Sequence, residues 1–341
     1  MSYVVERVEW KDEAAAVSAL LAQAFPCVPI TRYAWLHEMN PAGPGALWLA
    51  RDAAGRAVGT AAVHRRRILI DGHAHRAGLP ADFVVARDVR GFGPALALQR
   101  AVLAACENGD FDFLYGFPNR AAKPVFERIG YRVGDSRRLA RPLRLSSYLS
   151  RGRRWRSLVS VFAGPLDHLL HLLSRETYGA MPRRAHVEPL EHFGPEFDAF
   201  WKRARIGHAV IGDRDATYMN WRYGKSPTRR YDVIALRQDA EILATIVSYR
   251  IGNVVFVADA LARDASAFDA IFAAFLRAQR RAGLDGVSLI AMGDLGVAAG
   301  MEKYGFIRRE VERTMMVYLP AAAAPPLTSL ERWCLFEGDV L

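Results

Sequence analysis

The chain shows the same order of expected secondary structure twice. Across residues 3–143, hydrophobic alternation and turn residues predict a strand, two helices, three strands, a helix, a strand, a helix and two strands. From His186 onward the order recurs at an offset of about 175 residues, which is too long a period for a solenoid. In residues 126–131 and again in 301–306, a helix ends on Gly and an aromatic residue enters a strand. An internal duplication that gives two lobes is the economical explanation.

The expected fold class is α/β (α+β), with two tandem lobes that each hold a mixed, mostly antiparallel sheet flanked by helices. The length of 341 residues agrees, because a typical domain has about 150. We expect an N-terminal lobe over 1–143, a basic helical linker over 144–184 and a C-terminal lobe over 185–320. The tail, 321–341, is expected to dock on the body because 333–339 is unusually apolar for a chain end.

The individual elements follow from period and punctuation. In the first half we expect strands at 3–10, 46–51, 57–70, 75–87, 111–117, from 131 and at 138–143, with helices at 12–25, 31–39, 93–108 and 119–129. In the second half we expect strands at 186–190, 231–237, 242–251, 254–260, 287–292 and from 306, with helices at 195–205, 215–223, 265–283 and 296–304. A further helix is expected in the linker, over 155–174.

Composition excludes several classes of protein. The hydrophobic share of 51% and the charged share of 24% are those of a globular protein, not of a disordered or fibrous one. The apolar runs are interrupted well before the roughly 18 residues that a bilayer span needs, and the first twelve residues lack the pattern of a secretory signal. Three scattered cysteines (Cys27, Cys106, Cys334) do not form a disulfide framework, so we expect a cytoplasmic protein.

A net charge of +10 would ordinarily raise nucleic acid or an anionic surface as a partner. Only five of the 46 basic residues are Lys, so the excess of Arg with abundant Ala reflects GC-rich codons as much as selection for charge. The local exception is the stretch 132–156, with nine Arg against Asp135 alone. This stretch is interpreted as a solvated linker face, with contact to an acidic partner as the alternative; nucleic acid is not expected otherwise.

The sharpest motif is the segment 85–95, where a strand ends, an Arg-Gly-x-Gly turn follows and a helix opens with Pro94 in its first turn. Glycines leave backbone N–H groups accessible and the helix start adds a positive partial charge, so the segment suits a pyrophosphate. It is neither a P-loop nor a dinucleotide fingerprint. A plain strand-to-helix turn is the alternative that the motif alone leaves open.

The surrounding pattern resembles the GNAT superfamily of acyl-CoA-dependent N-acyltransferases. The resemblance covers about residues 10–143 and rests on the three-stranded meander, Val84-Val85, the turn from Arg90 to Gly93, the segment 116–119 and the segment 126–131. The second half resembles the same fold, and the chain as a whole looks like two-lobed GNAT proteins that act on amines or envelope glycans.

The resemblance implies a set of acyl-CoA contacts. The fourth strand would splay from the fifth and pair its backbone with the pantetheine arm, the turn and helix start would hold the pyrophosphate, and Asn119 would bond or orient the cofactor. The implied residues are Phe83, Val84, Val85, Arg90, Gly91, Phe92, Gly93, Pro94, Ala95, Asn119 and Phe126.

Direct attack by an amine needs a base, because an aliphatic amine is almost fully protonated at pH 7. Asp82, one residue before the splayed segment, is the first candidate, acting directly or through water. Glu38 and His73 are weaker candidates. The alternative for Asp82 is an inward carboxylate satisfied by local N–H groups or by Arg76.

Two departures from the family pattern matter. The superfamily commonly has a Tyr four residues before the helix-ending Gly to protonate the leaving thiolate, but this chain has Phe126 there and Met301 in the second half. A thiol is a tolerable leaving group unaided, and Tyr115 or a residue of the other lobe could substitute. The second half also has no Gly in its corresponding turn, 262–267, and carries Asp264 there. We therefore expect one cofactor site, in the first lobe.

The remaining candidates belong to a substrate pocket or to the interior. Trp221 and Tyr223 lie in an aromatic, polar segment that either lines the pocket or forms a helix between the lobes. Asp259 is either a pocket group or a buried, paired carboxylate. His168 and His171 lack further ligands, so no metal is expected. No nucleophile motif supports a covalent acyl-enzyme.

The function expected is transfer of an acyl group, acetyl by default, from acetyl-CoA or another acyl-CoA to an amine. The acceptor would be a small molecule or a glycan, bound between the lobes. One alternative is a Fem-type transferase that takes an aminoacyl-tRNA and acts on an envelope precursor. The other is a CoA-binding or scaffold protein that has lost catalysis, which Phe126 and the altered second turn favour.

Overall fold

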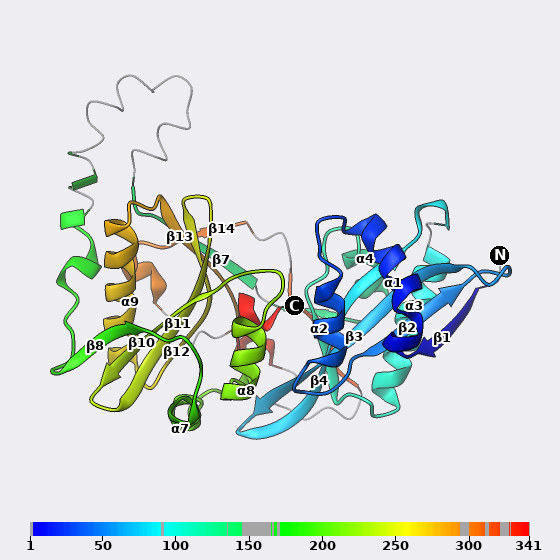
Figure 1. The fold of residues 1–341 in the computed structure, drawn as a ribbon, viewed down its shortest axis with the longest axis horizontal. Helices are drawn as coiled ribbons and strands as arrows, with labels where there is room; N and C mark the ends of the chain where they lie inside the picture. Colours follow the sequence, from blue (N-terminus) through cyan, green and yellow to red (C-terminus); the bar gives the residue numbers. More distant parts are fainter. Residues whose placement is uncertain are drawn as a thin grey trace.

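A computed structural model describes residues 3–89, 92–134, 136–144, 165, 167–168, 171–293, 300–310, 314–320, 327 and 329–340. The two halves of the chain lie side by side, each with a twisted sheet and its own helices (Figure 1). Strands of both halves are connected through continuous pairing into one mixed, mostly antiparallel sheet. Of the described helices, none is both long and apolar enough to cross a membrane.

The first lobe follows the expected order closely. Its strands are β1 (Val4–Val8), β2 (Ala46–Arg51), β3 (Ala57–Ile70), β4 (His73–Val85), β5 (Phe113–Gly116) and β6 (Arg132–Val133), and its helices are α1 (Trp10–Ala24), α2 (Thr31–Glu38), α3 (Phe92–Glu107) and α4 (Lys123–Arg128), with a short 3-10 turn, η1 (Arg87–Val89). Alternate residues of β2 pack on opposite faces: Leu47 and Leu49 meet α1, whereas Trp48 and Ala50 meet α3. The sheet is therefore covered on both sides, as the apolar run of β2 requires.

The second lobe repeats the plan. Its elements are η2 (Arg175–Tyr178), β8 (Ala185–Pro189), α7 (Pro195–Ala204), β9 (Val210–Gly212), α8 (Ala216–Met219), a π-helical turn η3 (Asn220–Gly224), β10 (Asp232–Gln238), β11 (Glu241–Ile251), β12 (Val254–Ala262), α9 (Ala265–Arg281), β13 (Gly286–Gly293), η5 (Met301–Tyr304) and β14 (Ile307–Arg309). The repeated Gly is confirmed as a structural requirement, since Gly130 (φ +94°) and Gly305 (φ +77°) both adopt the left-handed backbone that ends a helix. Most of the linker helix expected over 155–174 lies outside the described residues.

The last strands of the two halves are exchanged. β7 (Ser136–Pro142), expected to close the first unit, pairs instead with β13 and β14 of the second lobe. In return β15 (Met316–Tyr318) lies between β5 and β6 of the first lobe. The expectation that 138–143 completes the first sheet was wrong, because an alternating strand fits either sheet and its sequence does not encode which one it joins. The boundary predicted at residue 143 therefore does not separate the two sheets, because β7 precedes it in sequence but pairs with strands of the second lobe.

The C-terminal segment joins the lobes. β16 (Trp333–Phe336) pairs in parallel with β9 and antiparallel with β13, and β9 pairs with the far end of β3. Trp333 is fully buried between the two sheets. A 3-10 turn, η7 (Glu337–Asp339), follows. This described part of the tail supplies a bridging strand that the sequence did not predict.

A buried ion network holds this junction. Asp339 accepts from Arg66 of β3 at 2.9 Å and from Arg214, in the loop after β9, at 2.7 Å. Arg214 also pairs with Asp259 of β12 at 2.8 Å. All four side chains are at most 3% exposed, and their formal charges sum to zero. Such a network is tolerated in an interior only because each charge is paired and hydrogen-bonded.

Removing one member should therefore be costly. We expect Arg214→Met to lower the free energy of unfolding by about 3–5 kcal/mol, because Asp259 and part of Asp339 lose their counter-charge while remaining buried. The measurement is urea denaturation of the full chain. Arg263→Met is the matched control: its pair with Asp264 has side chains 40% and 44% exposed, so the expected loss is about 1 kcal/mol or less. Equal losses in the two variants would contradict this account of the junction.

Candidate active site

The functional geometry begins where β4 leaves β5. The two strands pair only at Ala77 with Phe113 and at Gly78 with Leu114, so β4 beyond Gly78 has no strand partner on that side among the described residues. On its other side β4 carries a bulge: Thr60 of β3 is opposite Val84 and Ala62 is opposite Ala81, which leaves an extra residue in β4. Asp82 lies in the bulge with a left-handed backbone, φ +50°. The expected splay of the fourth strand is thus present.

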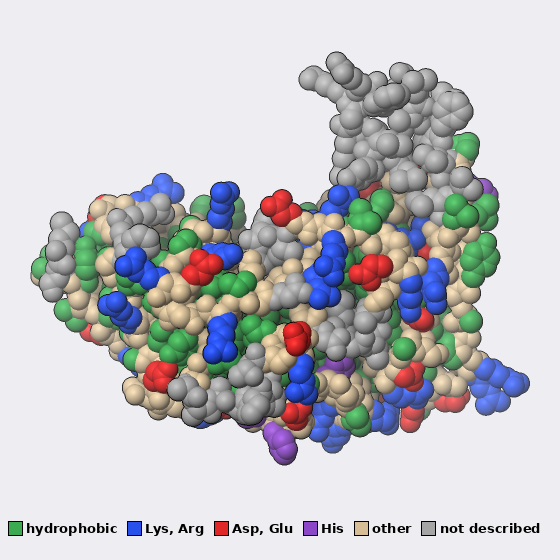
Figure 2. Space-filling model, turned by 180° about the vertical axis from the view of Figure 1, so that it is seen from behind, with side chains coloured by type: hydrophobic (Ala, Val, Ile, Leu, Met, Phe, Trp, Pro, Cys, Tyr) green, Lys and Arg blue, Asp and Glu red, His purple; other side chains and the backbone are tan. Residues whose placement is uncertain are grey.

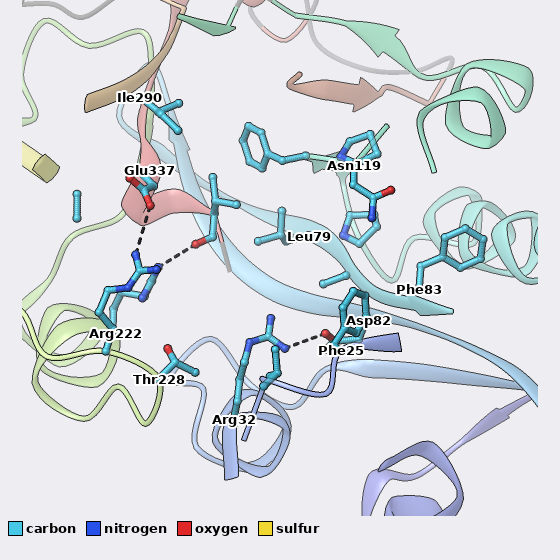
Figure 3. A pocket seen from close by; sticks show the side chains of 18 of the residues that line it. Phe25, Arg32, Leu79, Asp82, Phe83, Asn119, Arg222, Thr228, Ile290 and Glu337 are labelled. Carbon is cyan, nitrogen blue, oxygen red and sulfur yellow. Dashed lines mark hydrogen bonds and ion pairs between the residues drawn. The ribbon is translucent and has the colours of Figure 1, made fainter. Parts of the chain in front are cut away.

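The bulge opens on a cavity of about 590 Å³ between the lobes. Asp82, Phe83 and Asn119 lie on one side of it and Arg222, Ile290 and Glu337 on the other (Figure 3). The second side comes from the inner face of the second-lobe sheet and from η7. The cavity therefore needs both halves of the chain, as expected for an acceptor pocket between lobes.

Asp82 is a paired carboxylate. It accepts from Arg32 of α2 at 2.8 Å and lies 3.1 Å from Nε2 of His64, with 6% of its side chain exposed. Burial raises the pKa of Asp82, but the charge of Arg32 and the hydrogen bond from His64 outweigh it and hold the pKa below its usual value. The partner is Arg32 and not Arg76, which pairs with Asp112. Asp82 lines the cavity as expected, but both its oxygens are occupied.

Two buried histidines lie behind Asp82. His37 stacks on Trp10, with ring centroids 4.9 Å apart, and its edge meets His64. Burial lowers the pKa of His37 to about 3, so the ring is neutral at physiological pH. His37, His64 and Asp82 each place one donor atom within 4.8 Å of the others, yet Arg32 puts a positive charge on the same carboxylate. This cluster is better suited to fixing the bulge than to holding a cation.

The expected acyl-CoA residues divide into three groups. Phe83, Asn119 and Phe126 line the cavity, and the side-chain oxygen of Asn119 accepts from the backbone N–H groups of Ala121 and Ala122 at the start of α4. Val84 is buried against α1, and Val85 packs on the α3 side. Their backbones, not their side chains, border the splay.

The helix start is partly described. Arg90 and Gly91 lie outside the described residues, and of Phe92 only the backbone is described, as the first residue of α3. Gly93 is exposed in the first turn, and a Cβ added there would meet only a ring carbon of Tyr3 at 4.0 Å. Pro94 and Ala95 are buried beneath it. The first turn of α3 therefore presents bare backbone to its surroundings, as an anion cradle requires.

Three predicted catalytic or substrate residues are not brought to the cavity. Tyr115 is fully buried, its hydroxyl donates to the backbone oxygen of Asp339 at 3.2 Å, and burial raises its pKa well above the usual range. Glu38 is exposed at the end of α2, and His73 is exposed at the turn between β3 and β4. None of the three is among the side chains that line the cavity.

The second-lobe candidates belong to the interior. Trp221 stacks on Trp35 with ring centroids 4.3 Å apart, and the hydroxyl of Tyr223 donates to Asp259 at 3.1 Å. Asp259 is paired with Arg214. The alternatives stated for these residues, a helix between the lobes and a buried paired carboxylate, describe their surroundings correctly. Their neighbour Arg222 does reach the cavity.

Sequence reasoning missed Glu337. Its Oε1 accepts from the hydroxyl of Tyr249 and lies 3.4 Å from Arg229, whereas its Oε2 is buried with no hydrogen-bond partner. Glu337 lines the cavity, and a carboxylate there is suited to binding an ammonium group or taking a proton. The apolar segment 333–339 indicated that the chain end docks, but it did not indicate that Glu337 lines a cavity.

Comparison with known proteins agrees with this geometry. Residues 7–134 match the family described as the acetyltransferase (GNAT) domain. The match spans the first lobe through β6 and bears out the resemblance to the GNAT acetyltransferases over this part of the chain. None of the curated proteins compared matches the chain.

Solved structures share the fold over both halves. A GCN5-related N-acetyltransferase from Anabaena variabilis matches with 14% identity and a TM-score of 0.65, covering 92% of this chain and 72% of that chain. Eis1 from Mycobacterium abscessus matches with 12% identity and a TM-score of 0.61, covering 93% and 73%. A probable N-acyltransferase from Enterococcus faecalis matches with 10% identity and a TM-score of 0.66, covering 93% and 72%. At such identities the likeness concerns the fold.

The burial of Tyr115 gives a direct test of its predicted role. We expect Tyr115→Phe to lower stability by about 1 kcal/mol, through loss of the hydrogen bond to Asp339, and to leave the rate of acyl transfer within twofold. Tyr249→Phe is the comparison, because that hydroxyl lies in the cavity on Glu337 and its loss should change the rate. A tenfold or larger fall in the rate for Tyr115→Phe would restore the residue as a proton donor.

Proposed function

We propose that the protein transfers an acyl group, acetyl by default, from an acyl-CoA to an amine by direct attack in a complex that holds both. The observation that carries the proposal is the free edge of β4 beyond Gly78, which ends in a bulge on the wall of the cavity between the lobes. An extended arm with amide groups can add to such an edge as a further strand does. Its thioester would then lie beside Asp82 and Phe83, facing the acceptor.

The donor would approach from the side of α3 and α4. The first turn of α3 offers backbone N–H groups and the positive end of a 16-residue helix to the pyrophosphate. Asn119 and Phe126 line the passage from there to the bulge. Arg90 and Gly91 are proposed to complete the cradle on the strength of the sequence motif alone.

A single donor site fits the second lobe as well. The corresponding helix, α9, begins at Asp264, whose carboxylate accepts from the backbone N–H of Ala267 at 2.9 Å. This helix start already carries its own anion, so a pyrophosphate would meet both a blocked N–H group and a repulsive charge. The second lobe is proposed to serve the acceptor instead.

Glu337 is the better base on geometric grounds. A protonated amine must lose a proton before it attacks. Glu337 lines the cavity and only one of its oxygens has hydrogen-bond partners, whereas both oxygens of Asp82 are held by Arg32 and His64. We propose that Glu337 receives the proton, directly or through water. Asp82 is proposed to hold the bulge; its own role as base remains the second hypothesis. Phe126 cannot donate a proton to the leaving group, so the thiolate is proposed to leave unaided, as its moderate basicity allows.

The alternatives have less support. The face of the molecule in Figure 2 carries Lys and Arg side chains interspersed with Asp, Glu and apolar groups, which does not favour a tRNA-binding surface there. Most of the basic stretch 132–156 lies outside the described residues. A scaffold without catalysis would bind acyl-CoA and release no thiol with any amine.

The donor site is tested at Gly93. Acetyl-CoA should bind the unaltered protein in a calorimetric titration, and Gly93→Asp should abolish binding, because a carboxylate would crowd and repel the pyrophosphate. An Asp in the first turn favours the helix itself, so the loss would not come from unfolding. Gly93→Ala is the control: its methyl group meets only Tyr3 at 4.0 Å, and binding should persist. Unchanged affinity in Gly93→Asp would remove this cradle.

The base is tested by pH. We expect Glu337→Gln to lower kcat/KM by about 10²–10⁴-fold at pH 7, the usual contribution of a general base, and by much less at pH 9. The reason is that an amine with a pKa of about 10 is far more often unprotonated at pH 9. Asp82→Asn should show a fall that does not depend on pH. The reverse pattern would assign the proton transfer to Asp82.

A further inference from the structure

The charges on the cavity wall are unbalanced. Four arginines line it, Arg32, Arg138, Arg222 and Arg229, against two carboxylates, Asp82 and Glu337, among the described residues. Arg32 is neutralised by Asp82, and Arg229 lies 3.4 Å from Glu337 and stacks over the ring of Tyr249. The two arginines that remain are both on the second-lobe side.

Arg222 is buried without a carboxylate partner among the described residues. It is 7% exposed, and it donates to the backbone oxygens of Gly338 at 3.0 Å and Val340 at 2.8 Å and to the hydroxyl of Tyr231 at 3.2 Å. A guanidinium has five N–H donors, so these three neutral acceptors use three of them, and the side chain lines the cavity. No described carboxylate forms an ion pair with it. A buried charge in this state is costly unless an anion arrives.

Arg138 is the second unbalanced cation. It lies on β7, directly opposite Ile290 of β13, on the sheet face that lines the cavity. Its side chain forms a long hydrogen bond from Nε to the hydroxyl of Ser288, at 3.4 Å, and no ion pair with a described carboxylate. Because β7 is the strand exchanged into the second lobe, the exchange itself brings this charge to the cavity.

We propose that the acceptor is an amine that also carries an anionic group, a carboxylate or a phosphate, bound by Arg138 and Arg222. This inference rests on the proposed function and names the substrate class of the same cavity. Glu337 would take the ammonium end through its carboxylate, so that the two ends of the acceptor are recognised by opposite charges. Aromatic side chains between them, Tyr231, Tyr249 and Phe256, would cover the body of the acceptor.

The proposal excludes acceptors as well. A polyamine or other amine with several positive charges would bring cations against Arg138 and Arg222. Glu337 could pair with only one of those cations. Repulsion inside a low-dielectric cavity is stronger than in water. Such amines should be poor acceptors whatever their size.

Two pairs of probes test the anionic group. Glucosamine 6-phosphate is compared with glucosamine, and phenylalanine with phenethylamine. Each rate is measured at saturating acetyl-CoA by the release of thiol, and kcat/KM is calculated from the concentration of unprotonated amine. We expect at least tenfold higher kcat/KM for the anionic member of one pair. The pair that responds distinguishes phosphate from carboxylate as the anion.

The same preference should appear in binding without turnover. In calorimetry with CoA present, N-acetylglucosamine 6-phosphate or N-acetylphenylalanine should bind at least tenfold more tightly than its uncharged partner. Arg138→Gln should reduce the preference to threefold or less. Arg250→Gln is the matched control, since Arg250 follows Tyr249 in β11, is exposed, and bonds Gly252 and Asn253 away from the cavity. It should keep the full preference.

The outcomes separate the two proposals. Equal rates and equal affinities within both pairs, or a preference unchanged in Arg138→Gln, would overturn the anionic acceptor while acetyl-CoA binding and turnover left the acyltransferase standing. Absence of acetyl-CoA binding, with the anionic products still bound through Arg138, would overturn the proposed function and support the anion site alone.

Discussion

The cavity depends on the four buried charges of Arg66, Asp339, Arg214 and Asp259. They connect β3, η7, the loop after β9 and β12, so they fix the first lobe, the chain end and the second lobe relative to one another. Gly212 belongs to the same constraint: a Cβ there would collide with Asp339 and Arg66. Because Glu337 is two residues from Asp339, the ion network also fixes the position of the Glu337 side chain.

The strand exchange has a parallel consequence for chemistry. β15 supports β5 on the donor side, and β7 delivers Arg138 to the acceptor side, so each half of the sequence contributes structure to the part of the site that the other half dominates. Neither half contains a complete sheet or a complete cavity. In the proposed function the first lobe holds the donor site and the second lobe does not, as Asp264 at the start of α9 illustrates.

Local signals in the sequence were sufficient for much of this. The glycines at 130 and 305, the Pro at 94 and the turn after Ile70 predicted element ends correctly, because turn and cap chemistry acts over a few residues. Pairings distant in sequence could not be read. Asp82 meets Arg32 and His64, 50 and 18 residues away, whereas the alternative stated for it named local N–H groups or Arg76. The hydroxyl of Tyr115 meets a backbone oxygen 224 residues on. Such contacts decide which carboxylates are fully hydrogen-bonded and which line the cavity. The sequence therefore did not reveal Glu337 as a candidate.

The division of labour between the lobes explains why the unbalanced charge lies where it does. In the proposed function the donor side relies largely on backbone: the free edge of β4 would bind an extended arm and the first turn of α3 an anion. Recognition of the donor by backbone groups does not involve the acceptor, so it cannot select among acceptors. Selection then falls to side chains of β7, η3 and η7, which border the opposite wall and are free of the donor. Arg138, Arg222 and Glu337 are charged groups in that wall, and a binding site discriminates most strongly through charges that only the correct ligand can pair.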